Sequence, residues 1–138
     1  DNYTENYYKD LLDANKNIII SSPAISGQKV YELINMLKEK QASGVQITIV
    51  TWTPDSYGFG DAAYWMQLHE DMCKAGFYIK TVEESCERFA VIDQEVVWYG
   101  NINLLAKTKV DDSIMRVLSN EIAGELMEIT FGDNSGAE

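Results

Sequence analysis

Residues Ser85–Leu105 have the sequence SCERFAVIDQEVVWYGNINLL, with two short apolar runs on either side of a polar turn. The runs, Phe89–Ile92 and Val96–Tyr99, contain β-branched and aromatic side chains, which favour strands. The three residues between them, Asp93-Gln94-Glu95, have a length typical of a hairpin loop. This stretch therefore predicts a β-hairpin.

Polar side chains gather at the open end of this hairpin. Because side chains alternate between the two faces of a strand, Cys86 and Arg88 are expected on the same face as Ala90 and Ile92. Cys86 is also consistent with a small, half-buried strand residue, and free cysteines commonly take that place.

On the returning side, Gly100 breaks the strand, and Asn101 and Asn103 share a face. If the hairpin pairs in register, both asparagines lie near Cys86 and Arg88. A guanidinium matches the geometry of phosphate, so an arginine beside two amides predicts an anion pocket. The alternative for Arg88 is an ion pair with Glu84 or Glu87.

The rest of the chain alternates helical and strand patterns. The expected elements are a helix over Asn2–Asn15, a strand over Asn17–Ile25, a helix ending at Ser43-Gly44, a strand over Val45–Trp52, a helix ending before Gly76, a strand over Phe77–Val82, the hairpin, a strand over Ser113–Leu118 and a last helix. Ser119 or Asn120 is expected to cap the last helix, with Ile122, Leu126 and Ile129 facing inward.

The early crossovers are too long for hairpins and imply parallel strands, while the late hairpin is antiparallel. We therefore predict one α/β/α sandwich with a mixed sheet over residues 1–131, followed by a disordered tail over 132–138. A flavodoxin-like or receiver-like fold is the alternative. Receivers carry an acidic cluster after the first strand, and this chain has Ser21-Ser22-Pro23 there.

Composition excludes several classes of protein. The chain has 138 residues and a net charge of −11, and 46% of its residues are hydrophobic, too many for a disordered acidic tail. The acidic balance opposes general adhesion to DNA or to anionic membranes. No segment resembles a membrane span or a signal peptide, and we expect a cytoplasmic protein. With one histidine and two distant cysteines, no metal and no other cofactor is expected.

The hairpin resembles the motif of the phospholipase D-like superfamily. That motif is a His, a Lys two residues later, an Asp five residues after that, and Gly-Ser-x-Asn beyond a short hairpin. Asp93, Gly100 and Asn103 match it, and its other three positions hold Cys86 for His, Arg88 for Lys and Asn101 for Ser. The order of elements is also similar to that family over residues 17–131, including Ser22-Pro23 at the end of the first strand.

The resemblance implies phosphodiester chemistry without a metal. In the family a histidine attacks phosphorus, the lysine and asparagine hold phosphate oxygens, and a second histidine from another copy of the motif protonates the leaving group. A chain with one motif is therefore expected to act as a homodimer. Asp93 would mainly organise the site, although an aspartate there is also a common turn residue.

The sequence departs from the motif at the positions that take part in the reaction. Cys86 attacks only as a thiolate, which Arg88 favours and which Glu84 and Glu87 oppose. Arg88 cannot move a proton. We therefore expect catalysis to be lost or severely weakened, with phosphate binding kept at Arg88, Asn101 and Asn103.

Two further groups of residues are candidates for ligand contact. Tyr57 and Phe59, in a loop after the second strand, are placed to stack on a base or a sugar, or to act as a lid. Lys107 and Lys109 are expected either to line the path of a phosphate backbone or to lie in a solvated loop. His69 is expected on a helix surface, and Cys73 is expected to pack within that helix's interface.

Three functions remain open. The first is a degenerate phospholipase D-like domain that binds phosphate or nucleic acid as an accessory part of a larger, helicase-like or restriction-type DNA-processing protein. The second is a metal-independent phosphodiesterase or nuclease, active as a homodimer through Cys86. The third is a protein-interaction or dimerisation module, which the net charge of −11 favours.

Overall fold

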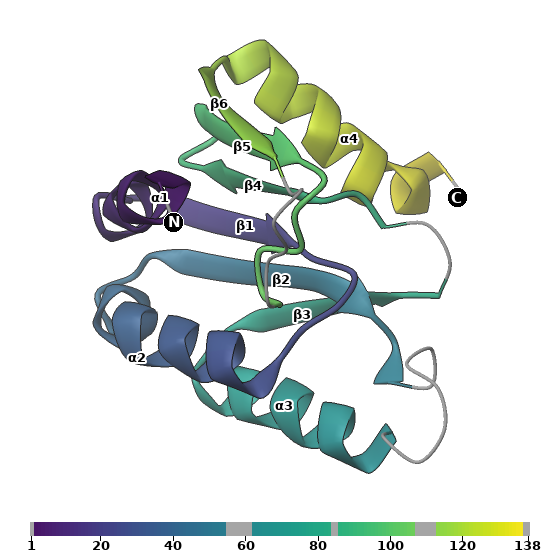
Figure 1. The fold of residues 1–138 in the computed structure, drawn as a ribbon. Helices are drawn as coiled ribbons and strands as arrows, with labels where there is room; N and C mark the ends of the chain where they lie inside the picture. Colours follow the sequence, from purple (N-terminus) through teal and green to yellow (C-terminus); the bar gives the residue numbers. More distant parts are fainter. Residues whose placement is uncertain (1, 55–61, 84–85, 107–112, 137–138) are drawn as a thin grey trace.

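The computed structural model describes residues 2–54, 62–83, 86–106 and 113–136. Ten elements follow one another along the chain (Figure 1). They are α1 (Asn2–Leu12), β1 (Asn17–Ser21), α2 (Gly27–Ala42), β2 (Gln46–Trp52), α3 (Ala62–Lys74), β3 (Tyr78–Val82), β4 (Phe89–Ile92), β5 (Val96–Gly100), β6 (Ile114–Leu118) and α4 (Asn120–Gly136). Among these described residues, no helix is long and apolar enough to cross a bilayer.

The strands form one mixed sheet in the order β3-β2-β1-β4-β5-β6. β1, β2 and β3 run parallel, and β4, β5 and β6 pair antiparallel, as the crossovers and the hairpin predict. The two halves of the sheet join where β1 pairs antiparallel with β4. The prediction of an α/β fold with a mixed sheet and a late hairpin is confirmed.

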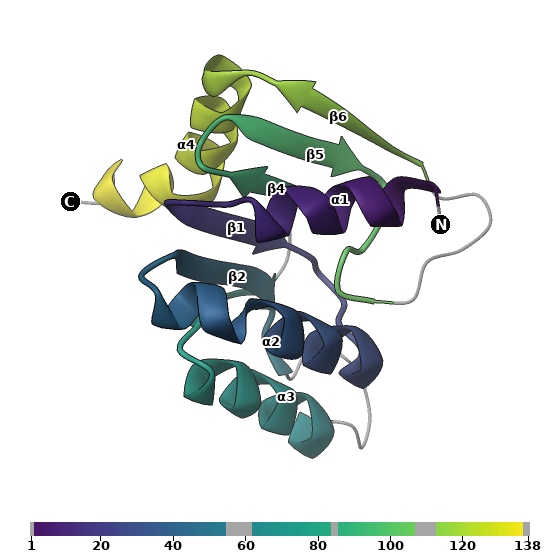
Figure 2. The ribbon, with the colours of Figure 1, turned by 90° about the vertical axis from the view of Figure 1, so that its left-hand side faces the viewer.

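Helices cover both faces of the sheet (Figures 1 and 2): α1, α2 and α3 lie on one face and α4 lies on the other. The Ile-Ile-Ile run of β1 shows why two layers are needed. Ile18 and Ile20 enter the core under α1–α3, while Ile19 enters a smaller core under α4. Burial of both faces explains the continuous apolar run.

The last helix differs from its prediction. Ser119 caps α4 by accepting a hydrogen bond from the Ile122 backbone N–H at 3.0 Å. Ile122 and Ile129 are 41% and 59% exposed, so their prediction as inward-facing residues was wrong. Leu126 is buried as predicted, and Ala123 faces the sheet in place of the two isoleucines, because α4 rests on the sheet along a narrow stripe rotated from the predicted one. The helix also continues past Gly132 to Gly136, further than the sequence predicted.

The first strand is shorter than predicted because its last side chains turn to other partners. β1 ends at Ser21, and residues 22–26 run beside the loop that follows β5. Ile25 forms a parallel bridge with Leu105, and the Ser26 N–H donates to the Leu105 carbonyl at 2.7 Å. This contact brings two loops together at one edge of the sheet.

Candidate active site

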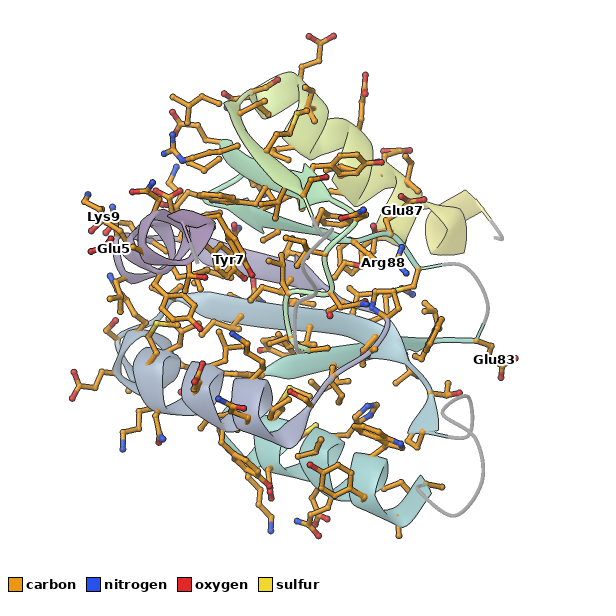
Figure 3. All side chains as sticks on the ribbon, viewed as in Figure 1. Glu5, Tyr7, Lys9, Glu83, Glu87 and Arg88 are labelled. Atoms are coloured by element: carbon orange, nitrogen blue, oxygen red, sulfur yellow. The ribbon has the colours of Figure 1, made fainter. Side chains whose placement is uncertain are left out.

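The candidate site lies at the edge of the sheet where β1, β2, β3 and β5 end and β4 and β6 begin. Phe89 of β4 pairs with Tyr99 of β5, so the residues before β4 face those after β5, as the hairpin register predicts. Figure 3 shows Glu83, Glu87 and Arg88 at this edge. Two loops and the start of β4 thus meet above the C-terminal end of β1.

Cys86, which the resemblance places at the nucleophile position, is half-buried. Its Sγ lies 3.5 Å from the Ser21 Oγ and 4.0 Å from the Val50 carbonyl oxygen. The thiol packs against the core under α4, whereas Ala90 belongs to the core under α1–α3. The prediction that Cys86 shares a face with Ala90 was wrong, because the strand begins only at Phe89 and the alternation does not extend back to Cys86.

The surroundings of Cys86 keep it protonated. Burial raises the pKa of the Cys86 thiol above its ordinary value. A hydrogen bond with Ser21 and the positive charge of Arg88 lower that pKa, and the negative charge of Glu87 raises it. Because burial outweighs the lowering effects, the thiolate that would act as a nucleophile is a minor species at neutral pH.

Arg88 is the cation of the site. Its side chain is half-buried, and its Nε is fully covered without a hydrogen-bond partner. Within the part of the chain that the structure describes, Arg88 forms no ion pair, and Glu87 beside it is exposed. Covered polar groups are normally paired, so this guanidinium N–H lacks a partner among the described residues, and an anion is suited to supply one.

Asn103 is held by the facing loop. Its Oδ1 accepts a hydrogen bond from the Ala24 backbone N–H at 3.3 Å, and the half-buried side chain keeps its amide N–H groups for another partner. Ser22 secures the same junction. The Ser22 Oγ donates to the Ala24 carbonyl at 2.7 Å and accepts from the Leu105 N–H at 3.1 Å. An amide fixed in this way offers donors to an anion.

Asn101 turns toward β6 instead. Its Oδ1 accepts a hydrogen bond from the Ser113 backbone N–H at 2.8 Å, and the Asn101 backbone N–H donates to the Ser113 carbonyl at 3.1 Å. Gly100 before it is the last residue of β5, and a Cβ there would collide with the backbone of Ser113. The glycine is thus explained by the close approach of β6.

Asp93 lies at the opposite end of β4 from Cys86, in the hairpin turn. Its carboxylate accepts hydrogen bonds from the backbone N–H groups of Asn15, Lys16 and Asn17, at 2.7–3.2 Å. Asp93 has a φ of 56°, a left-handed conformation that Asp adopts more easily than most residues. The structure therefore does not bring Asp93 to the edge that holds Arg88 and Asn103.

Sequence reasoning missed three hydroxyl residues that build the site. Ser21, Ser22 and Thr51 are buried. Ser21 donates to the Glu87 carbonyl at 2.5 Å, and Thr51 donates to the Pro23 carbonyl at 2.9 Å. The available signal was their position, since hydroxyl residues directly after or within buried apolar strands require hydrogen-bond partners.

The remaining candidates lie elsewhere or outside the described residues. Tyr57, Phe59, Lys107 and Lys109 are all outside them. His69, predicted on the surface, is half-buried in α3, and its covered Nε2 has no described partner. Burial lowers the pKa of His69.

The second cysteine, Cys73, also differs from its prediction. It is exposed on α3, so the expectation of a packing role was wrong. Within the described ranges, no group of three or more His, Cys, Asp or Glu side chains is arranged to hold a metal ion.

Comparisons with known proteins agree with this fold. A family model described as "Cardiolipin synthase, PLD-like domain" matches residues 7–130. Among solved structures, NucT from Helicobacter pylori has a similar fold, with a TM-score of 0.62 and 9% sequence identity over 93% of this chain and 84% of that chain. No curated protein matches the sequence. Because the family model spans nearly the whole chain, this chain belongs to the phospholipase D-like family.

Proposed function

We propose that this domain binds a phosphodiester group of nucleic acid at Arg88 and Asn103 and does not cleave it. The observation that carries the proposal is the covered Arg88 Nε without a partner, at the sheet edge where Asn103 also offers donors. A bound phosphate oxygen would satisfy both groups. Membership of the family supports a phosphodiester as the ligand.

The state of Cys86 supports binding without turnover. A raised pKa leaves the thiol protonated, and a thiol is a poor substitute for an imidazole that must also donate a proton. A metal-independent phosphodiesterase acting through Cys86 in a homodimer is the alternative function. It requires a thiolate, which burial disfavours.

We further propose that the domain acts as a homodimer and as an accessory part of a larger DNA-processing protein. One motif per chain supplies one anion pocket, and a second copy would supply another. Two pockets would follow a nucleic-acid backbone, which carries phosphates at regular spacing.

Binding of a fluorescein-labelled oligothymidylate, followed by anisotropy in EDTA, tests the proposal. We expect Arg88→Ala to weaken binding at least about tenfold, because it removes the charged donor. Lys38→Ala is the matched control, since Lys38 is an exposed cation on α2 away from this edge. Equal binding by wild type and Arg88→Ala would reject the site. A folded dimer without oligonucleotide affinity would favour an interaction module.

Hydrolysis of the same oligonucleotide in EDTA separates binding from catalysis. We expect no cleavage by wild type, because both the nucleophile and the proton donor are replaced. Cleavage by wild type that Cys86→Ser abolishes would establish the phosphodiesterase instead. Cleavage by Cys86→His alone would show an intact pocket whose reaction was lost with the imidazole.

A further inference from the structure

One flank of α4 carries two shallow hollows that are open to solvent. The first, of about 410 Å³, is lined by Gln94 of the β4–β5 turn and by α4 residues; the α4 residues are Asn120, Gly124, Met127, Glu128, Phe131 and Gly132. The second, of about 470 Å³, is lined by α4 residues alone and shares Gly124 and Glu128 with the first. We call this flank the α4 groove. Its two hollows extend along α4 from residue 120 to residue 132, which is about 18 Å at 1.5 Å per residue.

Nothing in the described part of the fold requires a glycine at position 124, at the centre of the groove. A Cβ added at Gly124 would meet no atom within 4 Å. Glycine inside a helix costs about 1 kcal/mol relative to alanine. A glycine that nothing in the described chain requires is explained if another backbone approaches the helix there.

The chemistry of the groove selects its occupant. Met127 and Phe131 supply apolar lining, and Ile129 is 59% exposed at the outer rim. The charged residues of the lining are Glu121, Glu125 and Glu128, and no lysine or arginine lines either hollow. None of these glutamates forms an ion pair with the described residues.

We propose that the α4 groove binds a cationic amphipathic helix of another protein segment. Its apolar stripe would fill the hollows, its backbone would approach Gly124, and its lysines or arginines would pair with the three glutamates. A nucleic acid or an anionic membrane would be repelled by the same charges. A second copy of this chain would bring two acidic ridges together, which is unfavourable.

The test uses the whole domain and a synthetic 14-residue helix of leucine, alanine and lysine, with leucines at positions i, i+3, i+4 and i+7. We expect it to bind at least about tenfold more tightly than a scrambled peptide of equal composition. Amide chemical-shift changes are expected to concentrate in residues 120–132. No binding, equal binding of the scrambled peptide, or shifts elsewhere would overturn the proposal.

A variant with a filled groove separates docking from general charge attraction. Gly124→Leu points a side chain into open space, so we expect the fold and oligonucleotide binding to be kept and peptide affinity to fall at least about tenfold. Glu39→Lys, an exposed charge change on α2, is the control and should leave peptide affinity unchanged. Unchanged affinity in Gly124→Leu would contradict the proposal. A concentration-dependent dimer that Gly124→Leu abolishes would assign the groove to a second copy and overturn it as well.

Discussion

The thiol of Cys86 decides whether the site holds an enzyme or a binding pocket. Burial raises its pKa, so its alkylation by iodoacetamide should have a pH midpoint above that of an ordinary cysteine thiol. Removing the nearby positive charge in Arg88→Ala should move the midpoint higher. Removing the negative charge in Glu87→Gln should move it lower.

Mass spectrometry of the peptide that contains Cys86 measures this midpoint across pH 6–10. The same peptide in the urea-unfolded protein serves as the reference for a solvent-exposed Cys86 thiol. A midpoint in the folded protein below that reference would contradict the proposed loss of catalysis, since the thiolate would then be more available near neutral pH.

We expect Ser22 to position Asn103 in the proposed pocket, because Ser22 bonds the Ala24 carbonyl and Asn103 accepts from the Ala24 N–H. Ser22→Ala leaves the Leu105 N–H and the Ala24 carbonyl without their side-chain partner and should lower the free energy of unfolding by about 1–3 kcal/mol. It should also weaken oligonucleotide binding at a temperature where the variant is fully folded. The control is Ser119→Ala, which removes the hydrogen bond that caps α4 at the opposite edge of the sheet. Equal affinities of the two variants for the oligonucleotide would contradict a positioning role for Ser22.

Asp93 acts at the scale of elements, because it ties the β4–β5 turn to the junction between α1 and β1. Its carboxylate accepts from three consecutive backbone N–H groups. Asp93→Ala should therefore lower the free energy of unfolding in urea by about 2–4 kcal/mol. Asp93→Asn keeps one acceptor oxygen and tolerates a positive φ, so its loss should be smaller. A loss of less than about 1 kcal/mol in Asp93→Ala would show that these hydrogen bonds contribute little.

The sequence predicted the positions of the helices and strands better than it predicted which of their side chains face the core. Periodicity located every strand, and the apolar run of β1 correctly indicated burial on both faces. It misplaced Cys86 because alternation was extended three residues beyond the start of β4. It misplaced Ile122 and Ile129 because the stripe that α4 buries depends on how the helix sits on the sheet, which its own periodicity does not determine.

Side-chain hydrogen bonds explain the other differences in the candidate site. Asn101 and Asn103 carry the same chemical group two residues apart, yet one binds Ser113 and the other binds Ala24. The difference depends on loops from distant parts of the chain. Ser22 contributes to the site through a hydrogen bond to Leu105, 83 positions later, which no local pattern reveals.

At the scale of the whole molecule, net charge limits how the domain binds nucleic acid. With a charge of −11, we expect attraction only at the proposed pocket around Arg88. If a single strand contacts one or two phosphate-binding groups, the logarithm of the binding constant should fall with the logarithm of salt concentration with a slope of about −0.7 to −1.4. Anisotropy titrations between 50 and 300 mM salt measure this slope. A slope steeper than about −3 would indicate a broad basic surface instead.

The pairing of β1 with β4 has a consequence for how the protein folds. Each half of the sheet is made of neighbouring segments, whereas this pairing joins distant ones: Ser21 and Cys86 are 65 positions apart, and Asn15 and Asp93 are 78 apart. Closing so long a loop costs entropy before the contacts compensate for it, so we expect this pairing to form late in folding. Arg88 comes from one half and the Ala24 partner of Asn103 from the other. The proposed anion pocket would therefore be complete only once folding is complete, and a bound phosphodiester would stabilise the pairing of the two halves.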